Sequence, residues 1–273
     1  SFKTGSSETA SEKMSISSAG DMTLSGTLIS STSGDDNVVI GQNAGANIAS
    51  GGDDNVLIGR DAGDALTTGD QNVAVGFEAL STEDANGENV AVGYRALKTL
   101  NAGAAGYNTA VGHSAGLAVT TGTLNTIVGG LAGDAVTTGE RNVLAGHNAG
   151  GAVTEGGSNT VIGDRALLAD TLGSNCVAIG RNALFAQNFS TATDNYNIAI
   201  GRDAGATVST GQKNVFIGGL AGDATDDGAS NVAVGYLALS ANCGDDNTAV
   251  GESALEACTG SNNTAVGRRA GEA

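Results

Sequence analysis

The sequence predicts an all-β protein built as a parallel β-solenoid of about fourteen coils. Three observations lead to this prediction: a repeated phrase, β-branched residues two apart within it, and the absence of proline among 273 residues. The phrase N-[VTI]-x-[VIA]-G-x-x-A-[GL] recurs every 16 to 21 residues. Such self-similarity marks a solenoid, in which each unit buries its apolar face only by stacking on its neighbours. The fourteen copies begin at Asn37, Asn55, Asn72, Asn89, Asn108, Asn125, Asn142, Asn159, Cys176, Asn197, Asn214, Asn231, Asn247 and Asn263.

The composition argues against several other classes of protein. Glycine is abundant but does not occupy every third position, which excludes collagen. Apolar residues make up 40% of the chain and are periodic, which excludes a disordered chain. The net charge of −17 disfavours nucleic acid and anionic membrane surfaces as partners. No apolar run approaches the roughly 20 residues needed to span a bilayer, so we expect no membrane insertion.

Each unit is expected to start with a short strand. In residues 72–88, Val73 and Val75 are two apart and therefore share one strand face, while Ala74 faces the other way. We expect the β-branched pair to line the coil interior. The intervening residue, which is never polar, would then form a second, outward-facing apolar surface.

The invariant positions predict the corners of each coil. Glycine at the strand end suits positive φ or close backbone approach, and alanine three residues later suits a narrow interior. A second strand is expected at residues 65–69, 118–122 and 135–139. The leading asparagine is expected to satisfy turn backbone groups or to stack in a ladder. Representative structural residues are Gly41, Gly59, Gly76, Gly93, Gly112, Ala62, Ala79, Ala96, Asn55, Asn72 and Asn89.

The thin core of such a coil predicts an assembly. A lone rod with so few large apolar residues gains little from burial, so we expect a homotrimer packed through the outward apolar faces. Residues 37–273 form the solenoid domain. Residues 1–36 are expected to be a β connector or shaft, with strands at residues 14–16 and 22–24. We interpret the chain, which begins at Ser1 and stops just after the last phrase, as a processed or partial segment of a longer protein.

The repeated phrase also carries a resemblance to known families. Its variants NVAVGxxAL, NTAVG (residues 108–112, 247–251 and 263–267) and NIAIG (197–201) resemble the head repeats of trimeric autotransporter adhesins and the NTAVGxxAL-type repeats of bacteriophage tail fibres and tailspikes. The resemblance covers residues 37–273. It implies a left-handed parallel β-roll, intertwined or packed as a homotrimer. The 17-residue period and the leader SEKMSISSAGDMTLSGTL (11–28) favour the phage group.

Two regions are candidates for receptor contact. The position after the invariant glycine is the most variable one, and in a solenoid such a position faces solvent or partners. It holds Phe77, Tyr94, His113, His147 and Tyr236. The alternative is a subunit interface or an ordinary solvated edge.

The longest insertion, between residues 176 and 197, is the second candidate, because it holds three aromatic residues in a chain poor in them. A self-packed loop or an intersubunit plug is the alternative, and the shorter insertion at 101–107 is a lesser candidate. Its candidate contact residues are Phe185, Gln187, Asn188, Phe189 and Tyr196.

Catalytic and metal sites are not predicted. The GDDN turns at 34–37, 52–55 and 244–247 contain clustered oxygens, but we interpret them as solvated acidic turns. Cys243 and Cys258 lie at nearly equivalent places on successive coils. A disulfide there is geometrically conceivable, and two free thiols are the alternative that we favour.

The sequence therefore predicts the structural and host-receptor-binding segment of a phage tail fibre or tailspike, extracellular on the virion and without enzymatic activity or a cofactor. Its expected partners are a host cell-surface glycan or protein receptor and other virion tail proteins. Two alternatives remain open: the head of a bacterial trimeric adhesin on the cell surface, and a polysaccharide-degrading tailspike.

Overall fold

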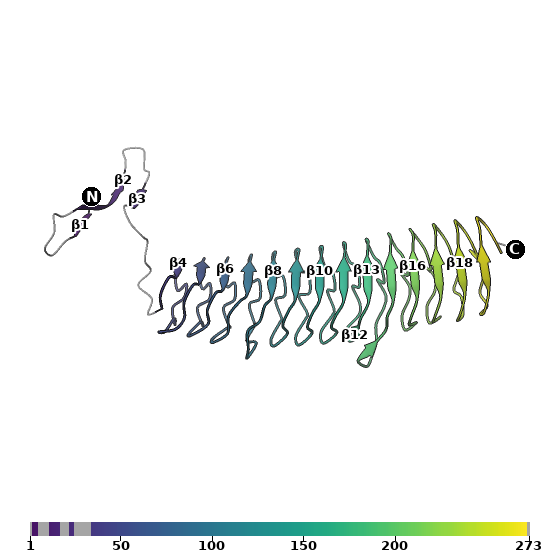
Figure 1. The fold of residues 1–273 in the computed structure, drawn as a ribbon, viewed down its shortest axis with the longest axis horizontal. Helices are drawn as coiled ribbons and strands as arrows, with labels where there is room; N and C mark the ends of the chain where they lie inside the picture. Colours follow the sequence, from purple (N-terminus) through teal and green to yellow (C-terminus); the bar gives the residue numbers. More distant parts are fainter. Residues whose placement is uncertain (1, 5–10, 17–21, 25–33, 272–273) are drawn as a thin grey trace.

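The chain folds as a long parallel β-solenoid of about thirteen turns (Figure 1). The computed structural model describes residues 2–4, 11–16, 22–24 and 34–271, and no helix occurs among them. One three-residue strand per coil joins a single sheet, in which each strand pairs in register with the next. The fourteen strands are β4 (Val38–Ile40), β5 (Val56–Ile58), β6 (Val73–Val75), β7 (Val90–Val92), β8 (Thr109–Val111), β9 (Thr126–Val128), β10 (Val143–Ala145), β11 (Thr160–Ile162), β13 (Val177–Ile179), β15 (Ile198–Ile200), β16 (Val215–Ile217), β17 (Val232–Val234), β18 (Thr248–Val250) and β19 (Thr264–Val266).

The N-terminal segment contains a separate antiparallel sheet. Strand β2 (Ser11–Ile16) pairs with β3 (Met22–Leu24), and Met14 lies opposite Leu24. This confirms the two predicted strands. A further strand, β1 (Phe2–Thr4), pairs with the other edge of β2 and was not predicted. Residues 17–21, between these two strands, lie outside the described residues.

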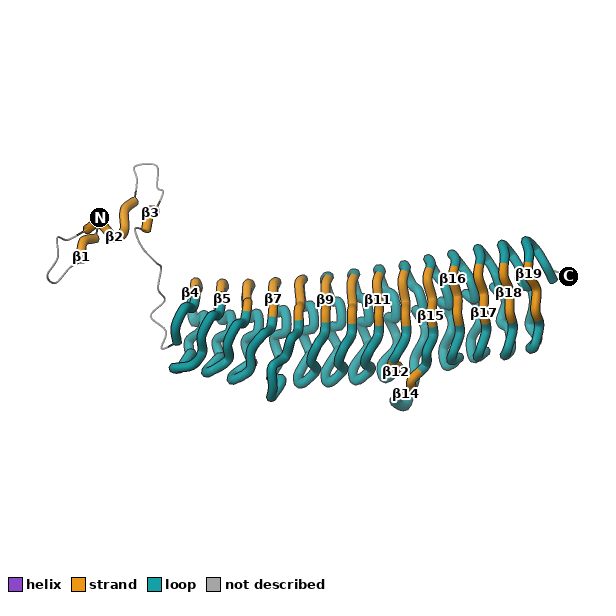
Figure 2. Tube along the Cα trace, viewed as in Figure 1, coloured by secondary structure: helices purple, strands orange, loops and turns teal. Residues whose placement is uncertain are grey.

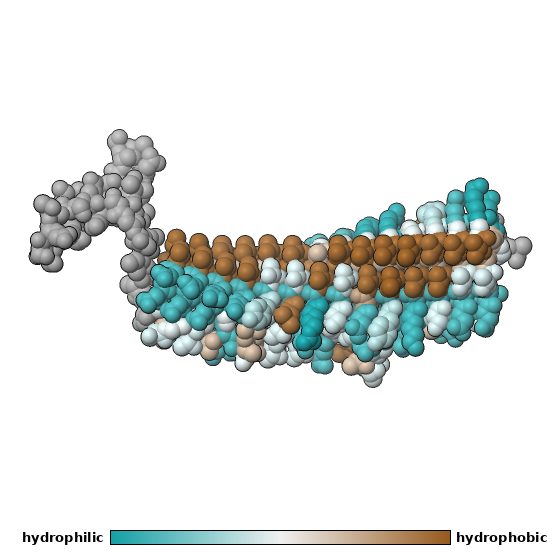
Figure 3. All heavy atoms as spheres, in the orientation of Figure 1, coloured by the Kyte–Doolittle hydropathy of each residue, from teal (hydrophilic) through white to brown (hydrophobic). Residues whose placement is uncertain are grey.

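The predicted assignment of the strand faces is wrong. The middle residue of each strand points into the coil: Leu57 and Ala74 are fully buried, whereas Val73 and Val75 are only partly buried. The coil is too narrow to hold two rows of β-branched side chains, so the single row occupies the inside. Two rows of Val, Ile and Thr therefore run along the outer face of the sheet (Figure 3).

The core is filled by residues of complementary size at two positions of the phrase. The large middle residues Leu57, Ile127, Leu144 and Phe216 are each followed six residues later by glycine. Coils that end the phrase with leucine have Ala or Val at the middle position. The packing is direct, since a Cβ on Gly63 would lie 2.8 Å from Leu57 Cδ2. Where both positions are small, as at Ala110 and Gly116, side chains of the neighbouring coils fill the space: a Cβ on Gly116 would lie 2.9 Å from Leu97 Cδ2 and 3.0 Å from Ile127 Cδ1.

The invariant glycines are required by the backbone, as predicted. At Gly129 φ is +136°, and a Cβ there would lie 2.5 Å from the carbonyl oxygen of Gly146 in the next coil. No L side chain fits such a position. Except for Ala270 in the last coil, the alanines three residues later are buried, which confirms the narrow interior expected at Ala62, Ala79 and Ala96.

The predicted second strand is absent from residues 65–69, 118–122 and 135–139 (Figure 2). Turns replace it, although the backbone still forms a ladder there: Thr120 N donates to Thr137 O, and Thr137 N donates to Thr154 O, both at 2.9 Å. Among the described residues of this side of the coil, only β12 (Gly173–Ser174) and β14 (Thr193–Asp194) form strands. The coil is too short for two straight edges because each side needs several left-handed residues to turn.

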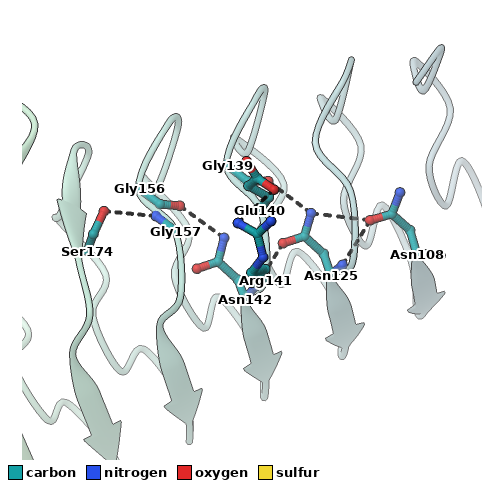
Figure 4. Close-up of polar contacts among 9 residues, drawn as sticks. All are labelled: Asn108, Asn125, Gly139, Glu140, Arg141, Asn142, Gly156, Gly157 and Ser174. Carbon is teal, nitrogen blue, oxygen red and sulfur yellow. Dashed lines mark hydrogen bonds and ion pairs between the residues drawn. The ribbon is translucent and has the colours of Figure 1, made fainter. Parts of the chain in front are cut away.

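The leading asparagines form a buried ladder along the rod (Figure 4). The side-chain oxygen of Asn125 accepts from the backbone N–H of Asn142 at 3.0 Å, and its amide donates to Gly139 O at 2.9 Å. Both predicted roles therefore occur together. Most of the asparagines satisfy two backbone groups of the next coil, the N–H of its own asparagine and the carbonyl oxygen three residues earlier, which ties successive coils together.

Candidate functional site

The variable position after the invariant glycine forms a row of exposed and half-buried residues at the ends of the strands, along one long edge of the rod. The rings of Phe77 and Tyr94 stack at 5.3 Å, and those of Tyr94 and His113 at 4.9 Å. The guanidinium of Arg60 covers Phe77 at 4.3 Å, and that of Arg95 lies over Tyr94 at 4.9 Å. Phe77 and Tyr94 use their faces on neighbouring rings and on arginine, so they present edges to a partner rather than faces on which a sugar could stack. His113 ends the stack, because Gly130 follows it on this row.

An ion-pair cluster supports this stack. Arg95 Nε lies 2.8 Å and Lys98 Nζ 2.5 Å from Glu78 Oε2. Hydrogen bonds to Glu78 lower its pKa, and the one from Lys98 has a larger effect than the one from Arg95. The ion pair with Glu78 holds the Arg95 guanidinium over the rings of Phe77 and Tyr94. The side chains from Arg60 to His113 are therefore fixed by contacts with one another.

The other two candidates on this row stand apart from the stack. His147 is exposed, and its Nδ1 lies 3.2 Å from Asp164 Oδ1 in the next coil. Tyr236 is 54% exposed and leans toward Gly219 of the preceding coil. The structure thus brings Phe77, Tyr94 and His113 together and leaves these two as separate features.

The long insertion is largely self-packed. Gln187 and Phe189 are buried, Phe185 is half-buried, and only Asn188 and Tyr196 of the five candidates are exposed. Gln187 and Phe189 were predicted as receptor contacts, but in this conformation their side chains are not accessible to a receptor. Their burial matches the self-packed alternative.

The insertion supplies the hydrogen-bond acceptors that the asparagine ladder lacks at Cys176. Cys176 has no amide to offer to Asn197, so Asn195 Oδ1 accepts the Asn197 backbone N–H at 2.9 Å. Gln187 Oε1 accepts the Asn197 amide at 2.8 Å, and Gln187 Nε2 donates to Asp170 Oδ2 at 2.6 Å. Burial raises the pKa of Asp170. The predicted exposed loop is thus partly a replacement for one missing side chain.

The shorter insertion is anchored in the same way. Glu83 is buried in the preceding coil at the position equivalent to Asp170, and its Oε2 accepts from Ala102 N at 3.2 Å. Burial also raises the pKa of Glu83. Both insertions end in a tyrosine, Tyr107 or Tyr196, directly before the asparagine of the next coil. The recurrence was readable in the sequence, since each insertion follows a coil with a carboxylate where other coils are mostly apolar.

A polar hollow of about 430 Å³ lies beside Tyr107. The carboxylate of Glu88 next to the phenol raises the pKa of Tyr107. Nothing in the sequence indicated this hollow, because its walls come from three successive coils. They include Thr68, Asp70, Gln71, Asn86, Glu88 and Tyr107.

The acidic turns have a structural role in the described part of the chain. Asp53 Oδ1 accepts from Asp35 N at 2.7 Å, and Asp245 Oδ1 accepts from Ala229 N at 2.9 Å. Within residues 34–271 and the N-terminal strands, no three His, Cys, Asp or Glu side chains gather in a way that could hold a metal ion. Cys243 and Cys258 are free thiols. No helix of the described chain is long and apolar enough to cross a membrane.

No protein-family model, curated protein or solved structure matches the chain. The relationship to phage fibres or autotransporter adhesins therefore stays a prediction from the repeated phrase.

Proposed function

We propose that this chain is a homotrimeric rod segment of a phage tail fibre or tailspike that contacts a receptor on the host cell. The observation that supports it is the apolar outer face of the sheet. Its two rows extend along all fourteen strands and consist of Val, Ile and Thr, with Ala145 as the one exception (Figure 3). Exposed members include Ile40, Val111, Val128, Ile162, Ile200, Ile217 and Val266.

An apolar stripe of this length favours a copy of the same chain as its partner. Contiguous exposed apolar patches beyond a few hundred Å² mark interaction sites. Because every coil presents the same two positions, three rods aligned in parallel match row against row over their whole length. A chain with a net charge of −17 needs such an apolar interface to overcome repulsion between its copies.

The apolar stripe would be buried in the trimer. The residues that directly precede and follow the strands, along the two long edges of each rod, would remain available for other contacts. Weak contacts repeated on three chains and along the rod add through effective concentration. The receptor would be a glycan or protein of the host surface, and the ends of the rod would join other tail proteins. The protein would act outside the cell, as part of the virion.

The assembly is tested by the mass of the protein in solution. Light scattering and sedimentation should give a trimer for the native chain and a loss of trimer for Val128→Asp, which places charge in the stripe. Leu124→Asp is the matched control, because Leu124 is a similarly exposed apolar residue away from the strand rows. A monomeric mass for the native chain would refute the proposed trimer.

Receptor contact is tested by adsorption. The labelled rod should adsorb to host cells and should compete with intact phage. Release of reducing sugar from host polysaccharide would instead favour a polysaccharide-degrading tailspike.

A further inference from the structure

We propose that the edge carrying Tyr107 and Tyr196 binds one extended chain of a neutral polysaccharide, with the two tyrosine rings as its stacking contacts. The inference rests on the proposed receptor-binding function and names the ligand class and the surface. Both tyrosines lie on the edge that precedes the asparagine ladder, which is opposite to the edge of the Phe77–His113 stack.

The two tyrosines are structurally equivalent. Each ends an insertion, each has a left-handed backbone (φ 48° and 53°), and their exposed fractions are 55% and 54%. In regular coils the residue at this position continues the backbone ladder, as Arg141 N does by donating to Thr123 O. At the insertions the ladder passes through the preceding residue, from Gly106 N to Gly87 O and from Asn195 N to Ser174 O. The ladder therefore bypasses both tyrosines.

Each tyrosine is held by a loop that is fixed to the core. The buried carboxylates of Glu83 and Asp170 accept backbone N–H groups of the two inserted coils, from Ala102 at 3.2 Å and from Phe189 at 3.4 Å. Placing a carboxylate in an otherwise mostly apolar column is costly, and the chain does so twice, at the same position. The arrangement orders both loops before any ligand arrives, which lowers the entropic cost of binding.

Among the described residues, the rings of these tyrosines make no ring stack, whereas Phe77, Tyr94 and His113 in the other row stack on one another. Within the described chain, the ring stacks and cation–π contacts involve Phe77, Tyr94 and His113 and leave out both Tyr107 and Tyr196. A tyrosine presents a large, rigid, amphipathic face at low entropic cost. Such a face packs on the C–H face of a pyranose ring.

The hollow beside Tyr107 supplies groups for sugar hydroxyls. Asp70, Gln71 and Glu88 line it. Two carboxylates, on a chain of net charge −17, repel anionic sugars. The chemistry therefore fits neutral, hydroxyl-rich units.

The spacing of the two tyrosines suits a polymer. They lie five coils apart, which is about 24 Å at the usual interstrand spacing of about 4.8 Å. One coil is close to the length of one pyranose unit in an extended chain, so successive sugars can pass successive coils. A single monosaccharide cannot contact both rings.

The experiment measures binding of the full chain to soluble β-glucan and galactomannan, with polygalacturonate as the acidic counterpart. We expect the native protein to bind a neutral polymer. Tyr107→Ala and Tyr196→Ala should each weaken binding about fivefold to tenfold, and together roughly multiplicatively. Tyr→Phe at each position should retain most of the affinity. Tyr236→Ala is the matched control, since that tyrosine is equally exposed but lies on the other edge.

The outcomes separate this inference from the proposed function. If the rod adsorbs to host cells but binds neither neutral polymer at millimolar sugar concentration, the inference is overturned and the receptor-binding function stands. The inference also fails if polygalacturonate binds more tightly, or if Tyr236→Ala weakens binding as much as Tyr107→Ala. Absence of both host adsorption and polymer binding would remove the receptor-binding function as well. Circular dichroism confirms that each variant is folded.

Discussion

The complementary sizes in the core make a quantitative prediction for Phe216 and Gly222. Phe216 is the largest fully buried side chain, and a Cβ on Gly222 would lie 2.5 Å from its Cδ1 atom. Phe216→Ala removes a buried ring and should lower the free energy of unfolding by about 4 kcal/mol. Gly222→Leu alone places a side chain in space that the ring occupies and should cost about 3 kcal/mol.

The double variant should recover most of this loss. It recreates the pairing of Ala233 with Leu239, and Leu239 has φ 56° where Gly222 has φ 60°. Leucine therefore fits the backbone at residue 222 once the ring is gone. We expect the double variant within about 2 kcal/mol of the native chain, against the roughly 7 kcal/mol that additivity gives. The residual cost arises because Phe216 also fills the space beside Gly205.

Equilibrium urea unfolding of the four proteins checks this prediction. The protein concentration must be the same throughout, because the stability of an oligomer depends on it. Coincident transitions by circular dichroism and fluorescence would justify a two-state treatment. If the double variant is as unstable as the sum of the single variants, the two positions do not share one space, and the explanation of the core is refuted.

Three further predictions concern the backbone, the ladder and the buried acids. Gly129→Ala should cost at least about 3 kcal/mol in urea unfolding, whereas Gly130→Ala, next to it in open space and without positive φ, should be neutral or slightly stabilising; equal midpoints would contradict the backbone argument. Asn142→Ala should cost about 2–5 kcal/mol, because it leaves two buried backbone groups unpaired, and unchanged hydrogen exchange in the flanking strands would count against it. Burial raises the folded-state pKa of Glu83 and Asp170, so their contribution to stability is fully present below the unfolded pKa near 4 and is lost as pH rises through the folded pKa. The melting temperature should therefore fall as pH rises above about 4, and Glu83→Gln with Asp170→Asn should flatten that slope; an unchanged slope would show that other groups set it.

Most of the coil could be predicted because the repeat encodes it directly. An invariant glycine at a fixed place implies one backbone conformation, and the structure has φ between +127° and +146° at all fourteen of them. The asparagine that begins thirteen of the fourteen copies implied buried polar contacts, which the ladder provides. The second strand was predicted wrongly because Thr-Thr-Gly segments have strand-like composition, whereas the tight coil leaves room only for turns.

The candidate sites were less predictable because they depend on neighbours from other coils. Phe77, Tyr94 and His113 are 17 and 19 residues apart, and only stacking of the coils brings their rings into contact. Gln187 and Phe189 looked like loop-tip residues by composition. Their burial follows from Cys176, which interrupts the ladder and draws Gln187 inward as a substitute hydrogen-bonding group.

The sequence by itself determined the period, the corners, the narrow alanine column and the polar ladder, since each depends on a residue type repeated in every coil. The tertiary structure decided which strand face is inside. Both faces of the strand are apolar, so alternation shows that Val73 and Val75 share a face but not which face that is. The width of the closed coil settles the question, because one row of small or complementary side chains fills it and two rows of β-branched ones do not. The outer stripe, which supports the proposed trimer, is a consequence of that limit.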